Sequence, residues 1–171
     1  DSGWELHGCD FSEYAVKMAK EKLGLDNVKL GRANEAGYQQ NYFDIVTLFE
    51  VIEHMDTPME EMKEINKLIR KGGWIVIQTG NLSSLNAKIR GASNPYFQLG
   101  HLNYFSKTTL KKLLEQAGFE VVRVETNMEK IEPAKIKAGK ATLMDYWRLF
   151  YYKIFETLQI SGGMTFYARK L

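Results

Sequence analysis

Apolar residues recur at two different spacings along this chain, and the two spacings alternate. Short apolar or alternating runs are typical of strands, whereas apolar residues three or four positions apart form one face of a helix. Strand-like runs occupy residues 4–10, 28–30, 45–49, 74–79, 119–124 and 164–169. Helical stripes lie between most of them, at residues 12–23, 57–69, 106–117 and 143–158. Strands that alternate with helices predict an α/β chain with a parallel sheet and right-handed crossovers, and no domain boundary interrupts residues 1–171.

Capping residues mark the expected helix ends. Ser12 and Ser106 are predicted N-caps, because a serine hydroxyl can accept a hydrogen bond from a free backbone N–H group of the first turn. Thr57-Pro58-Met59-Glu60 predicts a helix start with a capping box. That helix is expected to bury Ile69 and to end at Lys71-Gly72-Gly73.

Two longer segments, at residues 81–104 and 127–158, depart from the pattern. The first is polar, without clear periodicity, and predicts a loop with one helical turn near residues 85–89. A loop of this length is usually functional or disordered. The second joins a weakly patterned stretch to an aromatic helix that suits the core, a dimer contact or a lid. We expect both segments to be insertions that select or cover a substrate.

The composition and the net charge limit the classes of partner that are expected. Hydrophobic residues make up 44% of the chain and charged residues 26%, which is typical of a soluble globular domain. The net charge of +2 makes nucleic acid an unexpected partner and gives no attraction to an anionic membrane. Cys9 is the single cysteine, which favours a reducing, cytoplasmic location. Cys9 is expected to be a buried, inert thiol, and His7 in the same run to be structural.

Glu50, Glu53 and His54 directly follow the third strand-like run. Open α/β sheets bind ligands at the carboxyl ends of their strands, so this set is expected at a site. A helical turn there would place all three side chains on one face. His54 would then serve as a general base or substrate contact, or the set would bind a divalent metal, although we assign no metal. The structural alternative is that the glutamates stabilise a helix N-terminus while His54 packs beneath a loop.

Asp10 ends the first strand-like run, just before a helix. In doubly wound folds an acidic residue at this position accepts hydrogen bonds from the ribose of a nucleotide-containing cofactor. Phe11 would pack against the base. Alternatively, Asp10 only favours the positive end of the helix.

His101 and Tyr104 lie between the polar loop and the helix that Ser106 caps. Both side chains are candidates to orient a substrate hydroxyl group or to close the site. Tyr104 and Phe105 equally suit a hydrophobic staple at the helix start.

The order of these motifs resembles the class I S-adenosylmethionine-dependent methyltransferases, especially the ubiquinone-biosynthesis O-methyltransferases, over nearly the whole chain. The resemblance implies a Rossmann-like, mostly parallel sheet with an antiparallel last strand and helices on both faces. It also implies a cytoplasmic enzyme that methylates an oxygen or nitrogen atom of a small molecule. The motifs that carry it are Gly8-Cys9-Asp10-Phe11-Ser12, Phe43-Asp44-Ile45-Val46, Glu50-Val51-Ile52-Glu53-His54, Lys71-Gly72-Gly73, His101-Leu102-Asn103-Tyr104-Phe105-Ser106 and Ala117-Gly118-Phe119.

The resemblance also implies roles for single residues. S-adenosylmethionine is the implied cofactor, with catalytic support from His54 or His101 and a substrate contact from Tyr104. Where Arg32 stands, the family commonly has an aspartate that contacts the adenine amino group. The residues implied to contact the cofactor are Asp10, Phe11, Ala33, Asn34, Leu48, Phe49 and Glu50. Some relatives, including RNA 3′-end 2′-O-methyltransferases, hold a metal with a similar Glu-x-x-Glu-His set and a further histidine, for which His101 is the candidate.

The chain departs from the family pattern before Asp10. The family's first strand and its glycine-rich loop are expected there, and no segment of this chain replaces that loop. A sheet without that strand would expose unpaired backbone, which a homodimer could cover. We therefore expect the chain to be an N-terminally truncated methyltransferase domain. One alternative is a non-catalytic binding or scaffold domain that lacks the cofactor loop. Another is a nicotinamide-dependent oxidoreductase, which the Glu50–His54 set and the last strand disfavour.

Overall fold

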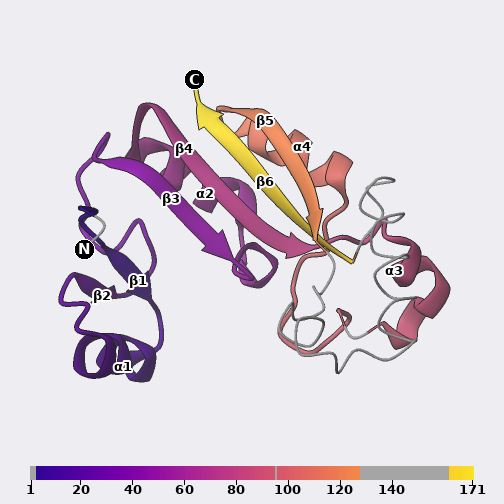
Figure 1. Ribbon diagram of the computed structural model, residues 1–171, viewed down its shortest axis with the longest axis horizontal. Coiled ribbons are helices and arrows are strands. Elements are labelled where there is room, and N and C mark those ends of the chain that lie inside the picture. Colours follow the sequence, from indigo (N-terminus) through magenta and orange to yellow (C-terminus); the bar gives the residue numbers. More distant parts are fainter. Residues whose placement is uncertain (1–2, 95, 128–161) are drawn as a thin grey trace, which may run out of the picture.

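A computed structural model describes residues 3–94, 96–127 and 162–171 of the chain (Figure 1). Helices and strands alternate as the apolar pattern predicts. The elements in chain order are β1 (Gly8–Asp10), α1 (Glu13–Leu23), β2 (Val28–Leu30), β3 (Phe43–Phe49), η1 (Ile52–His54), α2 (Pro58–Leu68), β4 (Ile69–Gly80), α3 (Leu85–Arg90), η2 (Gly91–Ser93), α4 (Lys107–Gln116), β5 (Phe119–Asn127) and β6 (Gly163–Lys170).

The described strands form two sheets. β1 and β2 pair in parallel as a sheet of their own, and the other four strands are ordered β3-β4-β6-β5. β3 and β4 are parallel, with Val46 opposite Ile75, whereas β6 runs antiparallel between β4 and β5. The α/β class and the antiparallel last strand are therefore confirmed. In the described part of the chain, β1 pairs only with β2 and β3 only with β4, so the edges of β1 and β3 away from those partners carry no strand.

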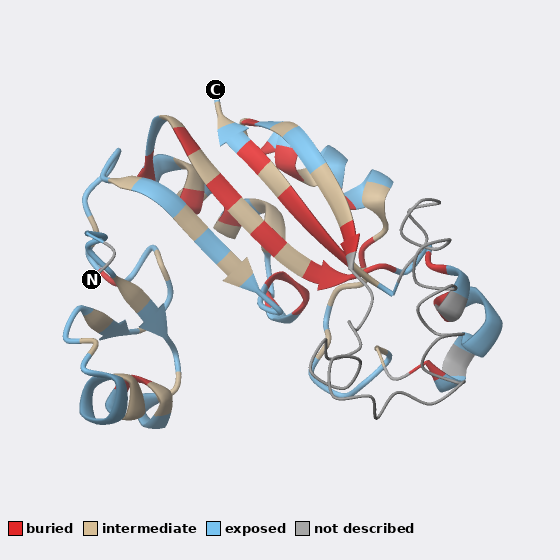
Figure 2. Cartoon of the chain, in the orientation of Figure 1, coloured by how far each residue is buried: buried red, intermediate tan, exposed pale blue. Residues whose placement is uncertain are grey.

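The hydrophobic core lies between the four-stranded sheet and two helices. α2 and α4 contact each other, and they contact β4 and β5 respectively, so they cover the same face of the sheet. Buried and less buried residues alternate along much of β4, as expected for a strand with one face in a core, whereas Met164, Thr165 and Phe166 of β6 are all buried (Figure 2). Burial of each large side chain stabilises the fold by roughly 1.5–3 kcal/mol. The fully buried members include Met62, Ile75, Ile77, Leu110, Leu114, Phe119 and Phe166.

The unit formed by β1, α1 and β2 lies to one side of the four-stranded sheet (Figure 1). Its helix buries only Val16. An edge-to-face aromatic group connects this unit to β3, in which the ring of His7 contacts Tyr38, Tyr42 and Phe43. These are the packing contacts expected of a structural histidine, although His7 also lines the space between this unit and β3.

Several local predictions hold. The hydroxyl groups of Ser12 and Ser106 accept hydrogen bonds from the N–H groups of Ala15 and Thr109, and so cap α1 and α4. The helical turn expected near residues 85–89 is α3. The aromatic helix expected at residues 143–158 lies outside the described residues.

Other local predictions are wrong at element boundaries. The first strand covers only the last three of the seven expected residues, 4–10. Thr57 precedes α2, but its side chain makes no capping hydrogen bond. Cys9 is exposed rather than buried.

The boundary between α2 and β4 also differs. α2 ends at Leu68, and Ile69 already pairs with Phe43 as the first residue of β4. The Gly72-Gly73 pair forms an irregularity inside the strand, with Gly72 at φ +74°, instead of ending the helix. Of the described helices, none has the length and apolar character required to cross a bilayer.

Candidate functional site

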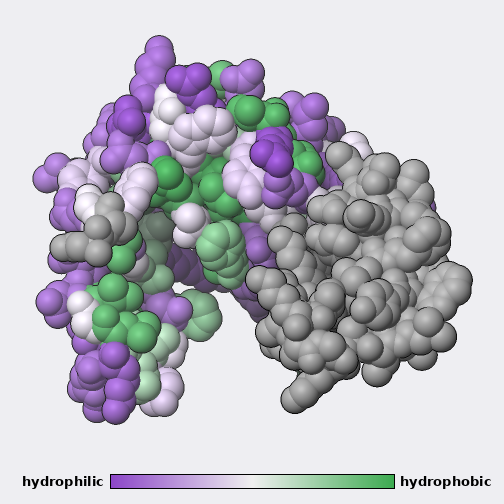
Figure 3. All heavy atoms as spheres, viewed as in Figure 1, coloured by the Kyte–Doolittle hydropathy of each residue, from purple (hydrophilic) through white to green (hydrophobic). Residues whose placement is uncertain are grey.

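The ends of β1 and β3 line one hollow of about 1290 Å³ between the two sheets. Figure 3 shows hydrophobic side chains gathered over β3 and β4, beside the gap that separates them from the β1–β2 unit. The predicted site residues that line the hollow are Asp10, Phe11, Ala33, Leu48, Glu50 and His54. Four others, Asn34, Phe49, His101 and Tyr104, are not part of its lining. The structure thus brings the acidic end of β1 and that of β3 to a common space, as the sequence analysis requires.

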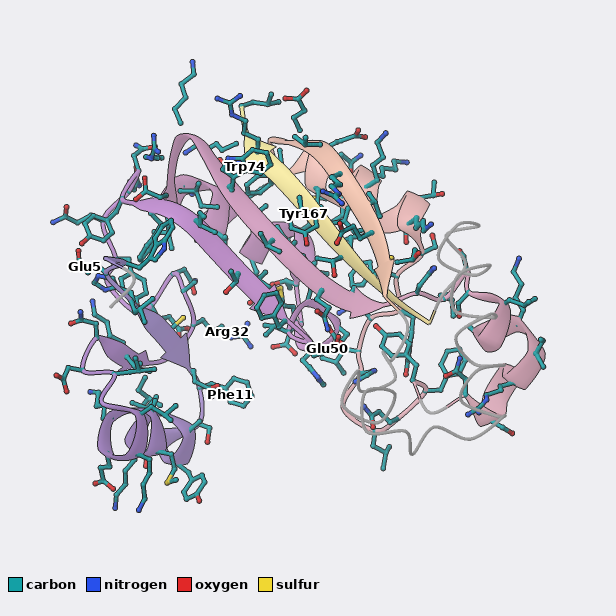
Figure 4. The ribbon with its side chains drawn as sticks, viewed as in Figure 1. Glu5, Phe11, Arg32, Glu50, Trp74 and Tyr167 are labelled. Carbon is teal, nitrogen blue, oxygen red and sulfur yellow. The ribbon has the colours of Figure 1, made fainter. Side chains whose placement is uncertain are left out.

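Asp10 lies at the start of the loop that leads into α1. Its Oδ1 atom accepts a hydrogen bond of 2.8 Å from the N–H group of Ser12. This contact matches the structural alternative, in which the carboxylate supports the helix start, and it uses one of the two carboxylate oxygens. The ring of Phe11 is 81% exposed and projects from the β1 unit into open space (Figure 4). Both side chains are therefore accessible to a ligand in the hollow.

Arg32 reaches from the loop after β2 to the region where α2 begins. Its guanidinium group forms ion pairs with Asp56 and, at 3.3 Å, with Glu61. These carboxylates raise the pKa of Arg32, the hydrogen bond to Asp56 contributing most. Arg32 therefore ties the β1–β2 unit to α2 at the wall of the hollow.

Glu50 directly follows β3 and has a strained backbone conformation. Its φ of +53° lies in the left-handed region, which side-chain-bearing residues rarely adopt, and its N–H group donates to the Gln78 carbonyl at 2.9 Å. Although the residue as a whole is exposed, partial burial of the carboxylate and the adjacent Glu53 raise the pKa of Glu50 to about 7. A carboxyl group that titrates near neutrality beside a hollow is a frequent property of functional sites.

Glu50, Glu53 and His54 do not share one helical face, so that prediction is wrong. Only Ile52–His54 is helical, as the single 3-10 turn η1, because Glu50 takes a left-handed conformation first. Glu53 is fully buried, whereas His54 is exposed at the hollow.

His101 lies next to this turn although it is far away in sequence. The N–H groups of Leu102 and Asn103 donate to the Glu53 carbonyl at 2.8 and 3.0 Å, which docks the loop onto η1. The rings of His54 and His101 are 4.8 Å apart between centroids. One potential ligand atom from each of Glu53, His54 and His101 lies within 4.8 Å of the others, so these three residues could hold a metal ion.

Tyr96, which no sequence pattern indicates, packs against this group. Its hydroxyl group is 2.9 Å from Thr79 Oγ1, and its ring contacts those of His101 and Tyr104. Burial, together with the negative charge of Glu53, raises the pKa of Tyr96 to about 12. A tyrosine in an aperiodic loop gives no signal in the sequence, because only the docking of the loop places it.

The two interpretations of the Tyr104-Phe105 pair separate in the structure. Phe105 is buried in the same core cluster as Leu110, four residues after the N-cap, as a hydrophobic staple requires. Tyr104 packs instead on the rings of Tyr96 and Phe97.

Comparison with known proteins accounts for this architecture. A family described as a methyltransferase domain matches residues 1–124. The chain belongs to this methyltransferase family. A demethylmenaquinone methyltransferase from Staphylococcus aureus is 29% identical over the aligned region, which covers 71% of this chain. The chain spans 60% of the length of that relative.

Solved structures of methyltransferases show the same fold. An S-adenosylmethionine-dependent methyltransferase from Archaeoglobus fulgidus superposes with a TM-score of 0.65 at 26% identity, over 98% of this chain and 77% of its own. One from Thermotoga maritima superposes with a TM-score of 0.70 at 17% identity, over 97% of this chain and 73% of its own.

Proposed function

We propose that this methyltransferase-family chain forms the S-adenosylmethionine-dependent active site of an enzyme that methylates an oxygen or nitrogen atom of a small molecule. The observation that carries the proposal is the common hollow, because Asp10 and Phe11 line it from β1, and Leu48 and Glu50 from β3. A cofactor with a nucleoside at one end and a charged amino acid at the other needs polar groups at two separated places. The hollow offers them, and its volume exceeds the roughly 300–1000 Å³ of ordinary ligand sites.

The proposed cofactor contacts follow from these positions. The free oxygen of Asp10 accepts from the ribose, Phe11 and Ala33 flank the adenine, and Asn34 assists at the loop. At the other end Leu48, Phe49 and Glu50 contact the methionine arm. A cationic ammonium group beside Glu50 would favour its carboxylate form, so cofactor binding near pH 7 should release a proton.

The reaction requires little covalent chemistry from the protein. Bound S-adenosylmethionine supplies a methyl group whose carbon–sulfur bond breaks as the bond to the acceptor forms. The chain's part is to hold the acceptor in line and to accept the proton that it loses. His54 and His101 are the proposed bases, with Tyr104 as a substrate contact.

Two segments that depart from the α/β pattern are the candidates to select the methyl acceptor. We propose that residues 81–104 and 127–158 select it, as two insertions in one domain, and that the enzyme is of the ubiquinone-biosynthesis type. One curated relative is named for demethylmenaquinone, and this name supports a quinone-like acceptor. In the described part of the chain, β1 and β3 each have one edge without a strand partner, which favours a homodimer or a further strand that completes the sheet.

Calorimetry with S-adenosylhomocysteine tests the proposal. The native chain should bind it, and Asp10→Ala should weaken binding about tenfold, as expected for the loss of one hydrogen bond to a ribose of about 1.5 kcal/mol. Asp26→Asn, an exposed carboxylate outside the lining of the hollow, is the matched control. A native chain that stays folded but gives no binding would favour the scaffold alternative.

A further inference from the structure

Acidic and basic residues are distributed unevenly along the chain, and the small net charge hides this. Residues 1–64 contain 14 acidic and six basic residues, whereas residues 65–114 contain eight basic residues and no acidic one. Interactions between exposed charges are screened beyond about 8–10 Å at physiological ionic strength, so a partner responds to the local charge of a surface rather than to the net charge of +2. A surface within the second range can therefore attract an anionic partner.

The loop between β4 and α4 lies within this basic range. The N–H group of Leu82 donates to the Phe105 carbonyl at 2.8 Å, so the loop leaves and rejoins the fold at one place, and we refer to it as loop 82–105. Its cations, Lys88 and Arg90, are exposed on α3, at the opposite end of the molecule from α1 (Figure 1). Among the described residues neither cation forms an ion pair, so their charge is available to a partner.

Loop 82–105 also exposes large apolar side chains. Leu85 and Ile89 are four positions apart on α3, so they lie on the same side of the helix, and Ile89 is 75% exposed. The complete set of exposed large apolar side chains in the loop is Leu82, Leu85, Ile89, Phe97, Leu99 and Leu102. Isolated exposed apolar residues occur on every surface, but a group of six in one loop is typical of a surface that contacts a partner or a membrane.

Exposed aliphatic side chains beside cations, with no carboxylate in the same loop, fit an anionic lipid surface. Aliphatic side chains enter the boundary between head groups and acyl chains, while lysine and arginine are attracted to acidic head groups. A nucleic acid would engage the cations through its phosphates but would leave the leucines without a role. A symmetric contact with a second copy would bring the same cationic surface of both chains together, and like charges repel.

We propose that loop 82–105 docks on the surface of a membrane that contains anionic lipids. Ile89 and Leu99 enter the interface, and Lys88 and Arg90 contact the head groups. A contact of this kind lies on the membrane and requires no helix that spans it.

The proposed docking surface lies beside the candidate site. His101 belongs to the same loop, and its ring centroid is 4.8 Å from that of His54, which lines the hollow. The inference does not depend on the proposed function, however, because binding to a vesicle needs neither a cofactor nor a methyl acceptor. Failure of one proposal therefore leaves the other standing.

Co-sedimentation with lipid vesicles tests the surface. The native chain should bind vesicles of phosphatidylcholine and phosphatidylglycerol, and raised salt should weaken this binding, whereas vesicles of phosphatidylcholine alone should bind much less. The double variant Lys88→Gln, Arg90→Gln should bind the anionic vesicles about 25-fold more weakly, since each cation near an anionic surface contributes about fivefold. Leu99→Ser should weaken binding about tenfold, because serine gains nothing from leaving water.

Matched control variants carry the same changes on α1, away from the loop. Lys20→Gln with Lys22→Gln lowers the net charge by the same amount, and Leu23→Ser removes another exposed leucine. Both controls should bind as the native chain does. Circular dichroism checks the fold of each variant, and Leu99→Ser should fold because Leu99 is fully exposed.

Weaker binding by both loop variants, with native binding by both controls, supports the membrane contact. No binding of the native chain to anionic vesicles, or native binding by the folded loop variants, overturns it. If the charge variant weakens binding and Leu99→Ser does not, the loop is a general polyanion site, such as one for nucleic acid, and the lipid contact is overturned. Self-association of the native chain without vesicle binding overturns it in favour of a second copy.

Discussion

At the scale of single residues, two glutamates three positions apart have different environments. Glu53 is fully buried in η1, whereas Glu50 leaves β3 through a left-handed conformation and remains partly in contact with water. Their spacing predicts one shared helical face, but the left-handed backbone at position 50 leaves Glu50 outside η1, although its carboxylate stays adjacent to that of Glu53. Of the two, only Glu53 belongs to the group of potential metal ligands that includes His54 and His101.

The raised pKa of Glu50 predicts a pH-dependent stability. Because the folded chain holds the proton up to about pH 7 while the unfolded carboxyl group loses it near 4.5, stability should fall as the pH rises between these values. Glu50→Gln should remove the loss of stability that Glu50 causes, because glutamine does not titrate. At pH 8 this variant should be more stable than the native chain by about 1 kcal/mol, a value that allows for solvent screening of the partly exposed carboxyl group. Urea unfolding of the native chain and of Glu50→Gln at pH 5 and pH 8 measures this difference in stability. Glu60→Gln, an exposed residue of α2, is the control, and a parallel loss in native and Glu50→Gln chains would contradict the prediction.

At the scale of elements, the junction between α2 and β4 shows how packing overrides a local signal. A glycine pair after a helical stripe is a typical helix end, yet here it lies within β4. A Cβ atom on Gly73 would come within 2.7 Å of the Ile69 side chain and 2.9 Å of the carbonyl oxygens of Arg70 and Asp44. The glycine is therefore needed for the close approach of β3 and β4 at the irregularity in their register.

Gly73→Ala should destabilise the chain by about 1–3 kcal/mol, because two of the three close atoms are backbone and cannot move aside independently. Thermal or urea unfolding measures the effect. Gly8→Ala is the control, since a Cβ there meets Val28 at 3.5 Å, an ordinary contact distance. Equal stabilities of the two variants would show that the β3–β4 junction relaxes without loss.

At the scale of the whole molecule, the hollow depends on how the β1–β2 unit is held beside the four-stranded sheet. No backbone ladder joins the two sheets among the described residues, so side chains make the connection. The aromatic group around His7 provides one attachment, and the ion pairs of Arg32 with Asp56 and Glu61 provide the other. The position of Asp10 relative to Glu50 is thus set by tertiary contacts alone.

Arg32→Gln should loosen the β1–β2 unit without unfolding the main sheet. Amide hydrogen exchange should become faster in β1, α1 and β2 and stay unchanged in β4 and β6, since local opening requires only the loss of the side-chain contacts. Raised salt should produce the same difference in the native chain, because exposed ion pairs are screened. Lys111→Gln removes an exposed pair on α4 as a control. Unchanged exchange in all three elements of the unit would refute this role of Arg32.

The sequence alone determined the α/β class, the main helices, the serine caps and the acidic ends of β1 and β3, since periodicity and capping act over a few neighbouring residues. It did not determine the end of α2 or the environments of Glu50 and Glu53, which depend on strand register and one left-handed residue. Only the tertiary structure brought His101 and Tyr96 to η1, and set Asp10 across the hollow from Glu50. Those arrangements depend on contacts between residues that are dozens of positions apart in the sequence. A local pattern of apolar and polar residues does not encode such contacts.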